Sequence, residues 1–116
     1  MTDLSLRSTI DELWERRDGL NANTKGADRD AVLSALEGLE AGTLRTAEKV
    51  GGEWIVNEWL KKAVLLSFRL FDSQLMDGAG GAPVWDKVAM KFSGWDAERF
   101  RKSGFRAVPG AIVRRS

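Results

Sequence analysis

The chain has 116 residues and a formal net charge of +1, with 43% hydrophobic and 30% charged residues. These values predict one globular domain, and no apolar run approaches the roughly 20 residues that a membrane helix needs. Cysteine, histidine and tyrosine are absent, which excludes disulfides, thiolate zinc sites and Ser-His-Asp or Cys-His catalysis. The amino-terminal residues lack the apolar core of a secretory signal, so we expect a cytoplasmic protein without a membrane partner.

The charge is unevenly distributed along the chain. Residues 1–86 carry 10 basic and 15 acidic side chains, whereas residues 87–116 carry 8 basic and 2 acidic ones. A basic end can attract a phosphate, a dicarboxylate or a nucleic acid, although a solvated surface is the commoner meaning of such an excess. Only Trp95 of the five tryptophans lies inside the basic stretch. Because no nucleic-acid-binding motif accompanies it, we expect no nucleic-acid partner.

Two helices are predicted in the first 41 residues. The first spans residues 3–20 and can be capped by Thr2 or Asp3. A polar loop with Gly26 follows, and the second helix spans residues 28–41, with Asp28 as its cap and Gly42 as its left-handed stop. Their apolar positions recur at helical spacing: Leu6, Ile10, Leu13 and Trp14 in the first, and Val32, Leu33, Leu36 and Leu39 in the second.

A β-hairpin and a third helix are predicted next. Residues 44–57 read as two strands joined by Gly51 and Gly52, which can adopt the positive φ angles of a tight primed turn. The third helix spans about residues 57–72, with Asn57 as its cap. Its expected apolar face consists of Leu60, Val64, Leu65, Phe68 and Phe71.

The last third of the chain predicts less regular structure. Residues 77–83 read as a glycine-rich loop that lacks the pattern of a phosphate loop. A short strand is expected near residues 87–92, then a short helix at 95–102 that ends at Gly104. Residues 105–109 are expected to be extended because Ala107 and Val108 precede Pro109. Together these elements predict an α+β domain, a small helical domain with a β-hairpin.

Several blocks of this sequence resemble the tetrahydrodipicolinate N-succinyltransferase family. The clearest is RTAEKVGGEWIVNEWLKKAVLLSFRLFD at residues 45–72, where a hairpin ending in a tryptophan precedes a WLKKAVLLSFR helix. VWDKVAMKF at 84–92 and WDAERFRKSGFRAVPGAIVR at 95–114 follow, and ELWERRD at 12–18 also fits. The resemblance therefore covers nearly the whole chain.

The resemblance implies a longer acyltransferase of lysine (diaminopimelate) biosynthesis. Members of the family transfer succinyl from succinyl-CoA to a dicarboxylate amine, assemble as homotrimers, and carry a left-handed parallel β-helix after the amino-terminal domain. We therefore expect residues 1–109 to form that amino-terminal domain and residues 110–116 to begin the connection to a β-helix that this chain does not contain. The coenzyme site and the acidic catalytic residue of the family lie on the β-helix. No catalytic, cofactor-binding or metal-binding residue is thus expected here, and the chain alone is expected to be inactive.

One substrate contact is implied for this chain. The arginine of the family's G-F-R-x-V-P segment matches Arg106, and a guanidinium suits a dicarboxylate because it binds a carboxylate through two parallel hydrogen bonds. Read without the resemblance, Arg106 is an ordinary exposed arginine. Lys61 and Lys62 are expected to be solvent-facing, and the carboxylates at 11, 12 and 15 to form a surface charge network with nearby arginines. The alternative function is a free-standing, non-enzymatic interaction or oligomerisation module.

Overall fold

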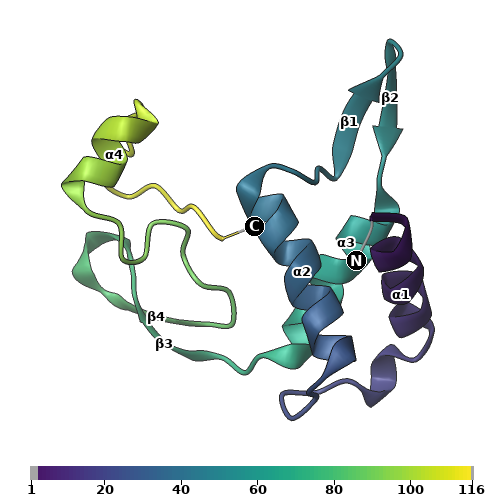
Figure 1. The fold of residues 1–116 in the computed structure, drawn as a ribbon. Helices are drawn as coiled ribbons and strands as arrows, with labels where there is room; N and C mark the ends of the chain where they lie inside the picture. The colour runs from purple at the N-terminus through teal and green to yellow at the C-terminus, as the bar shows by residue number, and fades with distance from the viewer. Residues whose placement is uncertain (1–2, 116) are drawn as a thin grey trace. The chain divides into compact units, whose positions relative to one another are not determined.

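The computed structural model describes residues 3–115, except for the side chain of Ala79. These residues form two compact units, 3–72 and 73–115, which are described separately. The expected α+β class is confirmed, because four α-helices and two antiparallel hairpins appear among the described residues (Figure 1). Thr2, one of the two expected caps, lies outside the described residues, as does Ser116. The expected boundary between residues 109 and 110 stays a prediction.

Three helices form the first unit. α1 spans Asp3–Glu15, α2 spans Ala27–Ala41 and α3 spans Glu58–Leu70. The first helix is therefore shorter than the predicted 3–20: after Glu15 the chain makes the 3₁₀ turn η1, Arg17–Gly19, which brings Leu20 into the core. Fully buried leucine, isoleucine, valine and alanine side chains from all three helices meet in one cluster. Burial of this apolar surface is the main stabilising contribution to the unit.

The ends of α2 confirm one prediction and correct another. Gly42 closes the helix at φ 78°, the left-handed conformation that glycine adopts without steric cost. The residue at the amino-terminal cap is Gly26, and its carbonyl accepts a hydrogen bond from the amide of Asp30 at 3.0 Å. The predicted cap Asp28 was wrong, because the helix begins one residue earlier and the Asp28 carboxylate binds Arg16 instead.

The expected face of α3 also needs correction. The side chains buried in the core are Trp59, Leu60, Ala63, Leu66, Ser67 and Leu70. Leu65, which was predicted to face the core, remains 48% exposed. The sequence is apolar on most sides of this helix, so its pattern alone did not fix which stripe packs against α1 and α2. Asn57 occupies the cap position, but its side chain makes no capping bond and donates instead to the Arg45 carbonyl at 2.7 Å.

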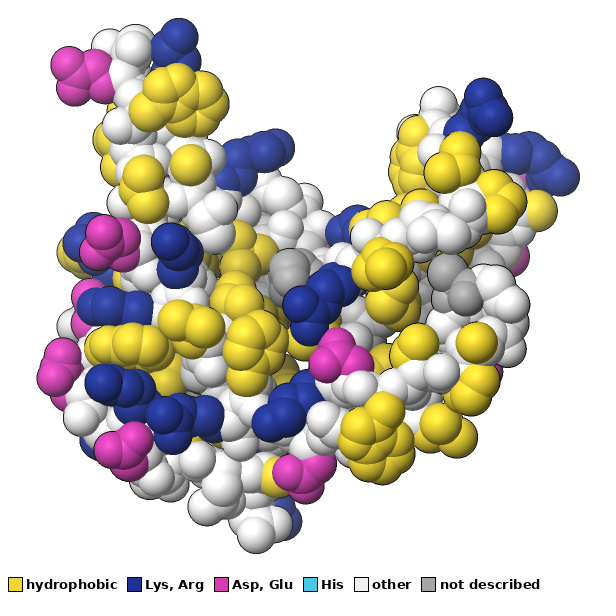
Figure 2. All heavy atoms as spheres, turned by 180° about the vertical axis from the view of Figure 1, so that it is seen from behind, with side chains coloured by type: hydrophobic (Ala, Val, Ile, Leu, Met, Phe, Trp, Pro, Cys, Tyr) yellow, Lys and Arg dark blue, Asp and Glu magenta, His cyan; other side chains and the backbone are white. Residues whose placement is uncertain are grey.

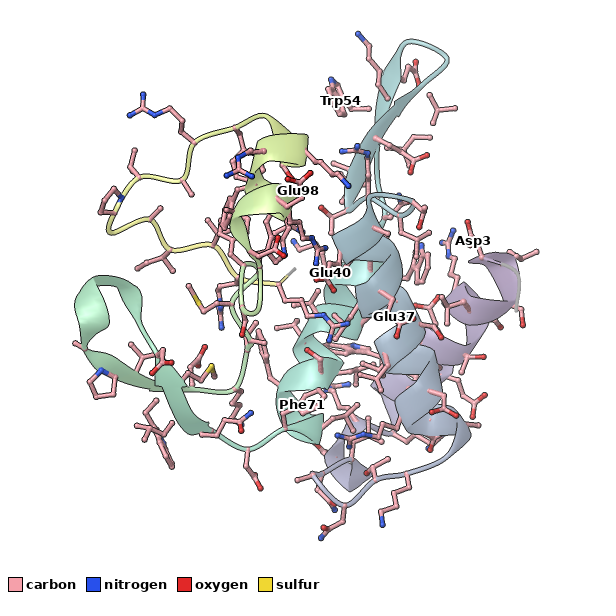
Figure 3. All side chains as sticks on the ribbon, turned by 60° about the vertical axis from the view of Figure 1, so that its left-hand side comes forward. Asp3, Glu37, Glu40, Trp54, Phe71 and Glu98 are labelled. Carbon is pink, nitrogen blue, oxygen red and sulfur yellow. The ribbon has the colours of Figure 1, made fainter. Side chains whose placement is uncertain are left out.

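The hairpin predicted at residues 44–57 is confirmed. β1, Ala47–Val50, pairs antiparallel with β2, Glu53–Val56, and Gly51 and Gly52 have φ 59° and 86°. Positive φ at both central residues is the requirement of a primed two-residue turn. Hydrophobic side chains cover this hairpin, seen at the upper left of Figure 2, and Trp54 projects sideways from the ribbon in Figure 3. Trp54 is 71% exposed.

The second unit contains a hairpin that the sequence analysis missed. β3, Gln74–Asp77, pairs with β4, Pro83–Asp86, around the short 3₁₀ turn η2, Ala79–Gly81. The predicted loop at 77–83 is therefore the turn of this hairpin, with Gly80 and Gly81 at positive φ. The strand predicted at 87–92 was wrong. That segment instead forms one isolated antiparallel bridge, between Met90 and Arg114.

The short helix predicted at residues 95–102 is confirmed with shifted ends. α4 spans Ala97–Ser103, and the Asp96 carboxylate caps it by accepting a hydrogen bond from the Arg99 amide at 2.9 Å. Gly104 ends the helix at φ 74°. Gly104 therefore sets the direction in which the next segment, residues 105–109, leaves α4. This segment carries the candidate residue Arg106.

Candidate functional site

Arg106 lies on a short segment that is held at both ends. On one side is the left-handed Gly104 at the end of α4. On the other side the Ala111 amide donates to the Val108 carbonyl at 3.0 Å, closing a turn through Pro109 and Gly110, with Gly110 at φ 92°. Proline followed by a positive-φ glycine is the pattern of a type II turn. The backbone around Arg106 is thus fixed although the segment is exposed.

An aromatic cluster anchors the residue next to Arg106. Four rings pack with centroids 4.8 to 6.2 Å apart: Phe92, Trp95, Phe100 and Phe105. Their tilted and edge-on arrangements are those that aromatic pairs prefer. The Arg99 guanidinium lies 4.3 Å from the centroid of the Trp95 ring. Because Phe105 belongs to this cluster, the chain is held in place one residue before Arg106.

The cluster forms one wall of a shallow hollow of about 450 Å³ beside Arg106. The described residues that line it are Phe100, Phe105, Arg106, Ala107, Val108 and Pro109. A mostly apolar hollow with one charged group is typical of sites for small ligands. Among the described lining residues Arg106 is the charged one, so an anionic group is the ligand that this hollow favours.

The Arg106 guanidinium is available for a ligand. It is exposed and has no hydrogen bond or ion pair with the residues described, 3–115. A guanidinium can bind a carboxylate through two parallel charge-assisted hydrogen bonds. No carboxylate or other general base lines the hollow among the described residues. The site can therefore bind and orient an acid, but it does not itself supply a group to accept a proton.

An ion pair outside the hollow connects two segments of the same unit. Arg114 donates to the Asp86 carboxylate at 3.0 Å, and the Val88 amide donates to the same oxygen at 3.4 Å. A backbone hydrogen bond from Lys87, helped by Val88 and Arg114, holds the pKa of Asp86 below its ordinary value. The Lys91 amide also donates to the Val113 carbonyl at 2.9 Å. These contacts tie residues 86–91 to 113–114.

A larger hollow of about 700 Å³ lies elsewhere in the second unit. It is lined by β3 and by residues near 89–94 and 111–113. Its described lining residues include no lysine or arginine, and Asp77 contributes an acidic group. An anionic ligand would therefore find no positive partner among these described lining residues.

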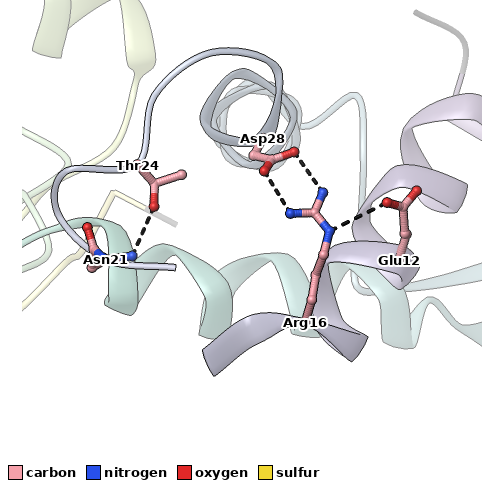
Figure 4. Close-up of polar contacts among 5 residues, drawn as sticks. All are labelled: Glu12, Arg16, Asn21, Thr24 and Asp28. Atoms are coloured by element: carbon pink, nitrogen blue, oxygen red, sulfur yellow. Dashed lines mark hydrogen bonds and ion pairs between the residues drawn. The ribbon is translucent and has the colours of Figure 1, made fainter. Parts of the chain in front are cut away.

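Most of the other charged side chains singled out in the sequence form ion pairs in the first unit. Lys62 reaches Asp11 at 3.1 Å, while Lys61 is exposed to solvent. Figure 4 shows Arg16 between two carboxylates: its two terminal nitrogens donate to Asp28 at 2.8 and 2.9 Å, and Glu12 lies 3.5 Å from its Nε. The expected surface charge network is confirmed for Asp11 and Glu12, which pair with Arg7 and Arg16, but Glu15 forms no ion pair among the described residues. Lys62, expected to face solvent, is paired with Asp11.

The described residues provide no metal site and no membrane helix. No group of three or more carboxylates in residues 3–115 is placed to hold a metal ion. None of the helices within that range is long and apolar enough to cross a membrane.

Comparison with known proteins assigns the chain to a family. Residues 5–70 match the family described as the tetrahydrodipicolinate N-succinyltransferase N-terminal domain. This match covers more than half of the chain and coincides with the three-helix unit and its hairpin. The chain belongs to that family. The resemblance inferred from the sequence blocks is therefore confirmed.

Curated relatives extend the similarity beyond the family domain. The chain is 60% identical over 117 residues to a protein of Rhodospirillum rubrum and 61% identical over 117 residues to one of Gluconobacter oxydans. Both are named 2,3,4,5-tetrahydropyridine-2,6-dicarboxylate N-succinyltransferase, and each alignment covers 100% of this chain. The chain spans 41% and 42% of the length of these two relatives. Similarity to this family therefore includes the unit that carries Arg106.

Proposed function

We propose that this chain is the amino-terminal part of a tetrahydrodipicolinate N-succinyltransferase, in which Arg106 binds a carboxylate of the substrate. The observation that carries the proposal is the 60% and 61% identity over the whole chain to proteins of that name. The unpaired guanidinium beside an apolar hollow supports the role of Arg106. The names of the relatives specify a dicarboxylate acceptor, which is the chemistry that a guanidinium recognises.

The proposed reaction divides the work between this chain and the rest of the protein. The acceptor is the ring-opened form of tetrahydrodipicolinate, in which addition of water to the cyclic imine has released an amine. This amine attacks the thioester carbonyl of succinyl-CoA, a C–N bond forms and the C–S bond breaks. Coenzyme A leaves as a thiolate, which takes up the proton that the amine loses. Arg106 would hold the carboxylate end of the acceptor, so that the amine stays near the thioester and the reaction gains from proximity. The base and the coenzyme site lie outside this chain in the proposal, because the hollow offers neither.

The proposal includes the wider architecture that the family resemblance implies. Residues 1–109 would form the amino-terminal domain and residues 110–116 would begin the connection to a left-handed parallel β-helix. The complete protein would be a cytoplasmic homotrimer with active sites between neighbouring subunits. The length of the relatives, of which this chain spans about two-fifths, is compatible with a further domain of that kind.

A chimera with a curated relative tests the proposed function. This chain would replace the matching 117-residue region of the Rhodospirillum rubrum protein, and succinyl transfer to tetrahydrodipicolinate would be followed by release of the coenzyme A thiol. We expect an active chimera and no activity from the 116-residue chain alone. A folded chimera that binds both substrates but transfers no succinyl would contradict the proposal.

An interaction module is the second candidate function. The exposed apolar hairpin of β1 and β2 favours it, because contiguous exposed apolar surface marks interaction sites. The two functions predict different results for the chimera. An interaction module that has lost the enzyme's geometry would fold in the chimera without supporting the reaction, whereas the amino-terminal part of the enzyme would support it.

A further inference from the structure

The β1–β2 hairpin has two apolar faces of opposite charge. In an antiparallel pair, directly opposed residues lie on the same face and successive residues alternate between faces. The pairing of Lys49 with Trp54 and of Val50 with Glu53 therefore defines two faces. The basic face consists of Ala47, Lys49, Trp54 and Val56, and the acidic face consists of Glu48, Val50, Glu53 and Ile55.

Both faces are exposed to solvent. On the basic face Trp54 is 71% and Val56 60% exposed, and on the acidic face Val50 is 50% and Ile55 45% exposed. Figure 2 shows hydrophobic side chains over the hairpin on the side that faces the viewer, with acidic and basic side chains near its tip. A two-stranded hairpin that is exposed to solvent on both faces is only marginally stable. The hairpin therefore gains stability from any partner that covers a face.

We propose that the basic face of one copy of this chain binds the acidic face of another. The apolar residues of the two faces can pack together, and Lys49 of one copy then meets the carboxylate of Glu53 in the next. Complementary charge selects the partner and its orientation. A second copy of the chain is a suitable partner, because every hairpin has one basic face and one acidic face.

The contact is heterologous, since it joins two different faces. Such a contact leaves one face free at each end of a pair, so copies add until a ring closes. Each hairpin face has four residues, against roughly 20 to 30 per side of a stable interface, so the hairpin alone gives a weak, concentration-dependent association. We expect a dissociation constant between about 0.1 and 1 mM. This surface is independent of the proposed acyl transfer, and either proposal can fail without the other.

Charge reversal on one face at a time tests the contact. Sedimentation equilibrium of the 116-residue chain at low salt would be compared with Lys49→Glu and Glu53→Lys. In each variant alone, positions 49 and 53 carry the same charge and repel across the contact, so association is expected to be about tenfold weaker. An equimolar mixture of the two variants restores opposite signs at both contacts and is expected to recover association. Recovery on mixing cannot result from misfolding, and circular dichroism of each variant checks the fold.

Lys61→Glu is the matched control, because it makes the same charge change at an exposed position on α3 and is expected to leave association unchanged. The proposal is overturned by a chain that stays monomeric at about 1 mM, which would leave another protein as the partner of the hairpin. It is equally overturned if the single variants associate like the parent or if the mixture fails to recover association. If Lys61→Glu weakens association as much as Lys49→Glu does, the effect comes from overall charge, and the proposed hairpin contact is also overturned.

Discussion

Arg16 and Asp28 show how one pair of side chains connects two helices. Arg16 follows the end of α1, and Asp28 lies in the first turn of α2, where both terminal guanidinium nitrogens donate to the carboxylate (Figure 4). The hydrogen bond from Arg16 lowers the pKa of Asp28 below its ordinary value, and the same bond raises the pKa of Arg16. The sequence marked Asp28 as a helix cap because aspartate is common there, but a fork of two charge-assisted bonds is the stronger contact.

The Asp28→Asn variant tests this pair through its pH dependence. Because the pKa of Asp28 is lowered in the folded state, its contribution to stability is present above the ordinary pKa of 3.8 and is lost as pH falls through the folded value. We expect Asp28→Asn to unfold at lower urea than the parent at pH 7, and the difference to close as the pH falls below 3.8 and through the lowered pKa of the folded state.

Asp30→Asn is the control for this measurement. Asp30 lies in the same first turn and is exposed, so it shares the favourable interaction with the helix dipole but not the Arg16 fork. Its effect should be smaller at pH 7. Equal urea midpoints for the two variants at pH 7 would show that the fork contributes nothing measurable.

Arg106 marks the limit of sequence reasoning for single residues. Its pattern alone was that of an ordinary exposed arginine, and it became a candidate through the resemblance of the G-F-R-x-V-P segment. The sequence did not predict the aromatic cluster that anchors Phe105, because the four rings come from a loop, a helix and an extended segment. Spacing along the chain gives no signal for rings that meet only after the chain turns at Gly94 and Gly104.

At the scale of elements, strongly periodic segments were predictable and weakly periodic ones were not. The helices of the first unit and the hairpin at Gly51 and Gly52 follow from apolar spacing and turn residues. The hairpin of β3 and β4 was missed although Gly80 and Gly81 adopt the same positive φ angles as the predicted pair. The strands of both hairpins are four residues long and mostly exposed, so the difference lies in the connection. Two glycines between strands predict a tight turn, whereas the longer glycine-rich connection of residues 78–82 reads as a loop.

Two adjacent leucines of α3 test the corrected packing of that helix. Leu66 is 0% exposed and lies in the core, whereas Leu65 is 48% exposed. We expect Leu66→Ala to lower the free energy of unfolding by about 2 to 5 kcal/mol, because it removes buried methyl groups and leaves a cavity. Leu65→Ala should lower the free energy of unfolding by only about 0.5 kcal/mol, because about half of this residue is already exposed to solvent. Urea denaturation of both variants checks the order, and a larger loss from Leu65→Ala would restore the face predicted from the sequence.

At the scale of the whole molecule, the chain divides into two compact units at residues 72 and 73, and the single amino-terminal domain expected over residues 1–109 stays a prediction. The buried apolar side chains all come from residues 6–70, and none of the side chains described in residues 73–115 is fully buried. Composition averages over both units, so it did not reveal this difference. The family match at residues 5–70 coincides with the unit that has the core.

The central claim is that Arg106 binds the carboxylate of the acceptor, and the most direct measurement is the KM for tetrahydrodipicolinate in the chimera. Arg106→Ala removes a charge-assisted pair and is expected to raise this KM about tenfold to a hundredfold, with the KM for succinyl-CoA little changed. Lys102→Ala is the matched control, because it removes an exposed cation from α4 outside the hollow. An unchanged KM for the dicarboxylate in Arg106→Ala, or an equal increase in Lys102→Ala, would contradict the account.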